Sequence, residues 1–343
     1  MSEERTFSVA VVGATGLVGE TMIEVLTERN FPVSELYPLA SNRSLGKSVE
    51  FRGRSYPVGE LAEFDFSKAD IGLFSAGAEV SREFAPQAAA AGCVVIDNTS
   101  EFRYEDDIPL VVPEVNPQAI AQYTQRGIIA NPNCSTIQLV LALKPLHDAV
   151  GIERIEVATY QSVSGAGREA LEELAAQSIQ LLSGKGPVTA RVVAKQIAFN
   201  CVPQIDRFED NGYTREEMKI VWETRKILDD PQILVNATAV RVPVFYGHSE
   251  VVHLQTRTKI TAAQARARLS EAPGIEVMDE RRAGGYPTAA TEAANRDTVY
   301  VGRIREDPSS ERGLNLWIVA DNVRKGAATN SVQIAEILAR QHM

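Results

Sequence analysis

The segment NPNCST, residues 131–136, places Cys134 between an Asn-Pro-Asn turn and two hydroxyl residues. A short apolar run typical of a strand precedes it, and a run with helical periodicity follows it. Backbone N–H groups at the start of a helix can lower the pKa of a thiol and so favour the nucleophilic thiolate. A buried structural cysteine would suit the same position equally well, because cysteine is among the most buried residue types. Position alone therefore leaves both roles open.

A nucleophilic cysteine needs a general base, and the chain contains four histidines. His147 lies late in a predicted helix, and His342 lies in the last two residues, where chains usually fray. His253 falls in the middle of a predicted strand, whereas His248 follows a glycine where that strand begins. By elimination, the sequence favours His248 as the partner of Cys134.

A second group of residues with chemical potential is the glycine-rich segment VVGATGLVG, which contains Gly13, Gly16 and Gly19. It follows a β-branched run and opens a helical pattern, the arrangement in which backbone N–H groups at a helix start bind pyrophosphate. The spacing G-x-x-G-x-x-G is only moderately specific, and a glycine-rich turn without a ligand is the alternative. We predict a dinucleotide site here and assign to it the other residues of the turn: Thr15, Leu17 and Val18.

The second predicted strand indicates which dinucleotide binds. Its end, LYPLASNRS, has no Asp or Glu for a ribose 2′-hydroxyl, and it places Arg43 and Ser44 just beyond the strand. A guanidinium and a hydroxyl suit a 2′-phosphate, which a carboxylate would repel. The sequence therefore favours NADP over NAD, and a solvated loop arginine is the alternative.

Composition excludes several classes of function. The net charge of −10 argues against a nucleic-acid surface, which needs clustered Lys and Arg. Three widely spaced cysteines, Cys93, Cys134 and Cys201, form no zinc motif and make a disulfide framework unexpected. The N-terminus has no signal-peptide core, and no apolar stretch approaches the roughly 18 to 20 residues of a membrane span. We expect a cytoplasmic protein without a metal site.

The order of predicted elements indicates how these residues are positioned. Residues 1–133 alternate strands and helices, which predicts a Rossmann-type, doubly wound parallel sheet with ligands at the strand C-termini. Residues 134–321 contain longer strands, including predicted strands at 152–167 and 234–247, and read as an α+β domain with a mixed or antiparallel sheet. The C-terminal segment, about 322–343, reads as a helix that completes the first domain. The fold class is α/β.

Five segments in this order resemble the aspartate-β-semialdehyde dehydrogenase family: GATGLVG, NPNCST, QSVSGAG, EEMK and RVPVFYGHSE. The resemblance covers essentially the whole chain. The related N-acetyl-glutamyl-phosphate reductases carry Gly before the cysteine and Tyr after it, and glyceraldehyde-3-phosphate dehydrogenases carry Ser-Cys-Thr-Thr. Neither setting is present in this sequence.

The resemblance implies reduction of aspartyl phosphate by NADPH to aspartate semialdehyde and phosphate, on the route to lysine, methionine and threonine. It implies that residues 134–321 form an α+β catalytic and dimerisation domain and that the protein is a homodimer or homotetramer. It also implies a thioester on Cys134, acid/base catalysis by His248, and orientation of the intermediate by Gln161. It also assigns three residues to the nicotinamide side of the cofactor: Ser164, Gly165 and Asn322. The rival functions are an N-acetyl-glutamyl-phosphate reductase-like enzyme and a non-catalytic NADP-binding sensor.

The substrate of such a reaction carries two anions. Arg241 stands in an otherwise apolar predicted strand, where an unpaired charge would be costly, and its planar fork suits the substrate α-carboxylate. By resemblance, Arg103 and Lys219 bind phosphate and Glu216 binds the substrate amino group. Glu216 and Lys219 are three apart and would share a helix face, which also suits a surface ion pair. Glu217 is adjacent, and the choice between the two glutamates stays open.

Overall fold

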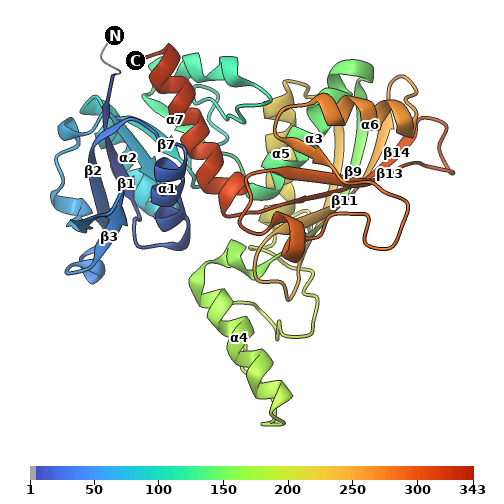
Figure 1. The fold of residues 1–343 in the computed structure, drawn as a ribbon, viewed down its shortest axis with the longest axis horizontal. Helices are drawn as coiled ribbons and strands as arrows, with labels where there is room; N and C mark the ends of the chain where they lie inside the picture. The colour runs from blue at the N-terminus through green and yellow to red at the C-terminus, as the bar shows by residue number, and fades with distance from the viewer. Residues whose placement is uncertain (1–4) are drawn as a thin grey trace. The chain divides into compact units, whose positions relative to one another are not determined.

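The computed structural model describes residues 5–343, which form two compact units (Figure 1). The first unit contains the chain up to Asn133 together with Ala327–Met343, and the second contains Cys134–Gly326. Among the described residues, no helix combines the length and the apolar character that a membrane span requires.

The first unit is built on a six-stranded sheet in the order β5-β2-β1-β6-β7-β8, in which every paired strand is parallel. Strands β6 and β7 read IGLF and VVID and are buried throughout, as expected for parallel strands covered on both faces. The Rossmann-type prediction is therefore confirmed. The strands are β1 (Phe7–Val12), β2 (Val33–Ala40), β5 (Gly59–Glu60), β6 (Ile71–Phe74), β7 (Val94–Asp97) and β8 (Ile128–Ala130), with a hairpin of β3 (Ser48–Phe51) and β4 (Arg54–Pro57).

Three helices and four short 3-10 segments complete the first unit. Helix α1 packs against α7, and a two-pronged ion pair joins Arg29 to Glu336, with Nε and Nη2 each 2.8 Å from a carboxylate oxygen. The helices are α1 (Leu17–Glu28), α2 (Ala78–Ala90) and α7 (Thr329–Gln341), and the 3-10 segments are η1 (Asn42–Ser44), η2 (Leu61–Glu63), η3 (Phe66–Lys68) and η4 (Pro117–Gln125). The predicted C-terminal helix thus starts later than expected, because a π-type turn, η7 (Arg324–Ala328), precedes α7.

The second unit contains a mixed sheet in the order β10-β9-β11-β14-β13-β12. The pairs β9–β10 and β12–β13 are parallel, and the remaining pairs are antiparallel. The strands are β9 (Ile152–Gln161), β10 (Leu234–Arg241), β11 (His248–Thr256), β12 (Ile275–Val277), β13 (Val299–Glu306) and β14 (Gly313–Ala320). Because β9 and β10 are parallel and in register, Gln161 and Arg241 lie side by side at the same edge of the sheet.

Two strand predictions in this unit were too long. Strand β9 ends at Gln161 and passes into a 3-10 turn, η5 (Val163–Ala166), and β10 ends at Arg241. Pro243 has no N–H to donate to a ladder, and Gly247 adopts a φ of +87° that breaks an extended run. The chain after both strands is therefore irregular, and the segment after β9 contains two predicted cofactor residues, Ser164 and Gly165.

Helices α3, α5 and α6 lie on one side of the second sheet, and α4 projects away from the sheet (Figure 1). Their bounds are α3 (Cys134–Val150), α4 (Arg168–Leu182), α5 (Arg215–Leu228) and α6 (Ala262–Glu271), with a π-type turn at η6 (Ala289–Ala293). On the other side of the sheet, the β9 side chains Arg154, Glu156 and Tyr160 are exposed. One face of the sheet thus forms a core with the helices, and the opposite face carries exposed side chains.

Candidate active site

The glycine turn of the first unit is held by close approaches that side chains would prevent. Gly13 adopts a φ of +88°, and a Cβ there would lie 2.8 Å from the carbonyl oxygen of Ser75. A Cβ on Gly19 would overlap the Gly13 carbonyl, and the Gly16 N–H donates to that same oxygen at 2.9 Å. These positions require glycine for geometric reasons, and the turn leads directly into the N-terminus of α1.

A cavity of about 500 Å³ opens beside this turn. Of the predicted cofactor residues, four line it: Gly13, Thr15, Gly16 and Ser44. Arg43 is exposed, and like Leu17, Val18 and Gly19 it does not line this cavity. The Thr15 hydroxyl lies 3.0 Å from the Ser44 hydroxyl and so connects the glycine turn to the segment after β2.

Sequence reasoning missed several cavity residues, including Ser75, which directly follows β6, and Glu60 of β5. Ser75 could have been found, because ligands bind at the C-terminal ends of parallel strands. Glu60 could not, because only the pairing of Ala40 with Glu60 brings it beside the end of β2. A carboxylate therefore lies beside the end of the second strand in the folded chain, although the segment LYPLASNRS itself contains none.

In the second unit, Cys134 is the first residue of α3 and is partly buried. Gly326 lies against it, and a Cβ on that glycine would be 2.9 Å from the Cys134 Cβ. The thiol is also close enough to act electrostatically on Arg241: burial lowers the pKa of that guanidinium, and Glu216 and Cys134 only partly oppose this effect. The nucleophile candidate thus stands where helix N–H groups and a guanidinium both favour a thiolate.

His248 is the first residue of β11, and its side chain is fully buried. Its Nδ1 lies 3.1 Å from both the backbone nitrogen and the hydroxyl oxygen of Ser162. Its Nε2 has no hydrogen-bond partner among the residues that the structure describes. Burial, followed by the positive charge of Arg241, lowers the pKa of His248 to about 3, so the imidazole is neutral near pH 7.

Arg241 lies close to this imidazole. Its Nη1 donates to the Ser162 carbonyl oxygen at 2.8 Å. Burial lowers the pKa of its guanidinium, and the nearby Glu216 and Cys134 raise it. A Cβ on Gly165 would lie 2.8 Å from Arg241 Nη1 and 3.3 Å from His248 Nε2, so a side chain at position 165 would fill the space beside both groups.

Gln161 leads from this group to a set of charged residues. Its Nε2 donates to Glu216 Oε1 at 3.1 Å, and the other Glu216 oxygen accepts from Lys219 Nζ at 3.2 Å. Lys219 also donates to Asp206 at 2.8 Å. Asp206 was missed from the sequence, since it lies in an irregular segment, and its φ of +69° is unusual for a residue other than glycine.

The neighbouring Glu217 has a different environment. Its carboxylate accepts from the backbone N–H of Thr214 at 2.7 Å and from that of Ala239 at 3.0 Å. With Thr214 it forms the capping box that begins α5. Both of its oxygens therefore have a structural task, whereas Glu216 faces Gln161 and Lys219.

Asn322 joins three segments of the second unit. Its Oδ1 accepts from the Ser162 hydroxyl at 2.9 Å, from the Ser164 hydroxyl at 3.0 Å and from the Gly247 N–H at 3.0 Å. Sequence reasoning assigned Ser164 and Asn322 to the cofactor and missed Ser162, although it lies between Gln161 and the glycine turn that follows.

The predicted phosphate ligand Arg103 lies in the first unit, where Nη2 donates to the Asn98 carbonyl at 2.9 Å.

The remaining histidines have structural contacts. His147 accepts from the Ile152 N–H at 3.2 Å, and His253, which is exposed on β11, pairs with Asn315. Among the described residues, no group of His, Cys, Asp and Glu side chains could hold a metal ion.

The contacts described above connect six predicted residues of the second unit: Cys134, Gln161, Glu216, Lys219, Arg241 and His248. A thiol, a neutral imidazole and fixed charges of both signs suit acyl transfer from an anionic substrate.

Comparison with known proteins identifies the family. Residues 8–123 match the model described as the NAD-binding domain of semialdehyde dehydrogenase, and residues 143–325 match its dimerisation domain. An aspartate-semialdehyde dehydrogenase of Legionella pneumophila is 64% identical, covering 99% of this chain and 97% of that protein.

Two solved structures support the same relation. Aspartate semialdehyde dehydrogenase II of Vibrio cholerae, in complex with ASA, is 60% identical with a TM-score of 0.97, covering 99% of this chain and all of that one. The enzyme of Candida albicans, with NADP, is 28% identical with a TM-score of 0.74, covering 97% of this chain and 98% of that one. The chain therefore belongs to the aspartate-semialdehyde dehydrogenase family.

Proposed function

We propose that this chain reduces L-aspartyl 4-phosphate with NADPH to L-aspartate 4-semialdehyde and phosphate, a step toward lysine, methionine and threonine. The observation that carries the proposal is the clustering of three side chains in the second unit: Ser162 contacts both His248 and Arg241, and Cys134 acts electrostatically on Arg241. The relative from Vibrio cholerae forms a complex with ASA, which agrees with this substrate class.

The first unit suits a nicotinamide dinucleotide. The turn at Gly13 leaves room for pyrophosphate, and the helix start beside the cavity favours its charge. The bound cofactor would supply the hydride. Thr15 and Ser44 offer hydroxyls to the ribose side, and Arg43 can reach a 2′-phosphate from solvent. Glu60 opposes such a phosphate, so the preference for NADP depends on Arg43 and Ser44 together and agrees with the NADP-bound relative.

In the proposed reaction the Cys134 thiolate attacks the acyl carbon, the bond between that carbon and the phosphate oxygen breaks, and a thioester forms. After reduction, the bond from carbon to Cys134 sulfur breaks and the aldehyde leaves. His248 exchanges protons at Nε2, the ring nitrogen that is not held by Ser162. Gln161 orients the intermediate from the end of β9.

Charged residues hold the substrate. Arg241 is fixed through Nη1 and presents a planar fork to the α-carboxylate. Glu216 binds the amino group, because both Glu217 oxygens already accept backbone N–H groups. Lys219 and Arg103 bind phosphate, and Ser164, Gly165 and Asn322 lie on the nicotinamide side.

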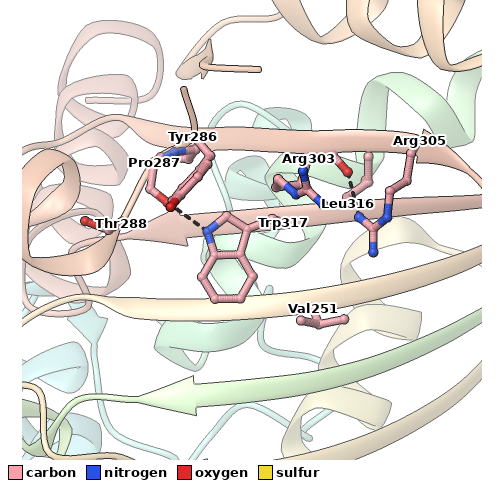
Figure 2. Close-up of a pocket in the computed structure, with 8 residues that line it drawn as sticks. All are labelled: Val251, Tyr286, Pro287, Thr288, Arg303, Arg305, Leu316 and Trp317. Atoms are coloured by element: carbon pink, nitrogen blue, oxygen red, sulfur yellow. Dashed lines mark hydrogen bonds between the residues drawn. The ribbon is translucent and has the colours of Figure 1, made fainter. Parts of the chain in front are cut away.

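We infer that residues 134–321 form the catalytic and dimerisation domain, and that residues 1–133 with the C-terminal helix bind the cofactor. The exposed face of the second sheet suits a homodimer interface. This unit also has a cavity of about 280 Å³, in which Trp317 Nε1 donates to the Pro287 carbonyl at 2.8 Å. Figure 2 shows the side chains that line this cavity, including Val251 and Leu316. Sedimentation of the purified protein distinguishes a dimer from a tetramer, and a monomer at micromolar concentration would contradict the inference.

The test of function is the reverse reaction. The purified protein is mixed with aspartate semialdehyde, phosphate and NADP⁺, and NADPH absorbance is followed. We expect turnover that depends on all three. Turnover with N-acetyl-glutamate semialdehyde instead would indicate the rival reductase, and NADP binding without turnover of either aldehyde would indicate a sensor.

A further inference from the structure

Ser162 contacts two of the proposed catalytic side chains at once. Its N–H donates to His248 Nδ1 at 3.1 Å, and its carbonyl accepts from Arg241 Nη1 at 2.8 Å. Its hydroxyl oxygen lies 3.1 Å from His248 Nδ1 and 2.9 Å from Asn322 Oδ1. The side chain is fully buried, so these are contacts with fixed groups and not with bulk water.

The backbone contact alone would limit His248 to one protonation form. A ring whose Nδ1 accepts from the Ser162 N–H carries its single proton on Nε2. In that tautomer Nε2 can donate a proton but cannot accept one. The proposed reaction requires both, because His248 must accept the thiol proton of Cys134 and later return a proton to the substrate oxygen.

The hydroxyl of Ser162 supplies the second form. The amide orientation of Asn322 is fixed, because the Gly247 N–H donates to the same Oδ1 at 3.0 Å and only the oxygen can accept it. The Ser162 hydrogen can therefore be donated to Asn322, which leaves an oxygen lone pair facing His248 Nδ1. A proton on Nδ1 then has an acceptor.

We propose that the Ser162 hydroxyl is a positioning group that allows His248 to act as a base as well as an acid. With the Nδ1 proton donated to Ser162 Oγ, Nε2 takes the proton of Cys134, which gives an imidazolium and a thiolate. The same proton later passes from Nε2 to the substrate oxygen, and the ring becomes neutral again. When the bond from carbon to sulfur breaks, that proton leaves the oxygen and returns to the Cys134 sulfur, so the aldehyde and the starting thiol are formed. The other charges acting on His248 are Arg241 of β10 and Glu216 of α5. This inference rests on the proposed function.

Ser162→Ala tests the proposal, because it removes only the hydroxyl and keeps the backbone N–H and carbonyl. Iodoacetamide alkylation of Cys134 is followed against pH in a Cys201→Ser background, since Cys201 is exposed. Cys93 does not interfere, because burial raises the pKa of its thiol to about 12. We expect alkylation to shift to higher pH in Ser162→Ala, and turnover to fall roughly tenfold to a hundredfold with little change in KM.

A matched control is Ser178→Ala, which removes a hydroxyl of α4 in the same unit that donates to the Leu174 carbonyl at 2.7 Å and has no contact with the imidazole among those described. Its alkylation profile should follow that of the parent. Ser162→Thr keeps the oxygen and should restore the parent profile. Thermal melts identify any variant that fails to fold.

Nitrogen-15 NMR of labelled histidine gives a second measurement that needs no variant. We expect a proton on His248 Nδ1 in the parent protein at pH values where Cys134 is reactive, and its loss in Ser162→Ala. A ring protonated only at Nε2 in the parent, or equal alkylation profiles in both proteins, would overturn the inference. Absence of turnover in the parent protein with aspartate semialdehyde, phosphate and NADP⁺ would instead overturn the proposed function, so the two failures are distinguishable.

Discussion

Glu250 provides a test of how burial of a carboxyl group beside the candidate site changes stability with pH. It lies two residues after His248 on β11 and is fully buried. Neither carboxylate oxygen has a hydrogen-bond partner among the described residues. The side chain of Gln138 of α3, one turn after Cys134, interacts with this carboxyl and favours its ionised form. Burial outweighs this effect and raises the pKa of Glu250 well above its usual value.

The sign of the effect on stability follows from proton counting. Between the pKa of an unfolded glutamate, about 4.3, and the raised pKa in the folded protein, the folded state binds one more proton. The free energy of unfolding then falls as pH rises, by up to about 1.4 kcal/mol per pH unit. The buried carboxyl of Glu250 therefore makes the folded protein progressively less stable as pH rises through this window.

Glu250→Gln removes the titration and keeps nearly the same volume, because an amide resembles the protonated acid. We expect urea unfolding at pH 5, 6, 7 and 8 to show the variant gaining stability relative to wild type as pH rises. Glu217→Gln is a matched control, for which we expect a loss of stability instead of a gain. It loses one of two acceptors for backbone N–H groups and should be destabilised by about 1 kcal/mol or more. If the free energies of unfolding of Glu250→Gln and wild type differ by the same amount at all four pH values, the argument from burial is wrong.

Three further predictions concern the reaction. Cys134→Ser should lose nearly all turnover and retain NADP binding, measured by fluorescence titration, because an alcohol is a far weaker nucleophile near neutral pH; turnover near wild type would exclude the thioester. Arg43→Ala should raise the KM for NADPH more than the KM for NADH. The difference between the two effects should correspond to the loss of one charge-assisted hydrogen bond, roughly 1.5–3 kcal/mol. Equal effects on both KM values would show that Arg43 does not bind the 2′-phosphate. Arg241→Lys keeps the positive charge and loses the planar pair of N–H donors. Steady-state kinetics should show weaker aspartate-semialdehyde binding and slower turnover, with a smaller change in the KM for phosphate. A rise confined to the KM for phosphate would show that the two anion sites were assigned the wrong way round.

The sequence alone predicted those features that depend on neighbouring residues. The turn at Gly13 lies between an apolar run and a helical period, and each of these is a local pattern. Cys134 was likewise placed between a strand and a helix by the residues around it, and the structure begins α3 at this residue. The strand ends were less predictable. Pro243 and Gly247 stop β10 early, although the apolar pattern continues through them.

Only the tertiary structure decided which distant residues meet. The parallel register of β9 and β10 places Arg241 beside Gln161, and the pairing of β2 with β5 brings Glu60 to the dinucleotide cavity. Glu216 and Glu217 are adjacent and chemically identical, so only the packing of α5 separates a site carboxylate from a helix cap. Such contacts join residues far apart in the chain, and their free energy depends on strand register and helix orientation, which no local pattern encodes.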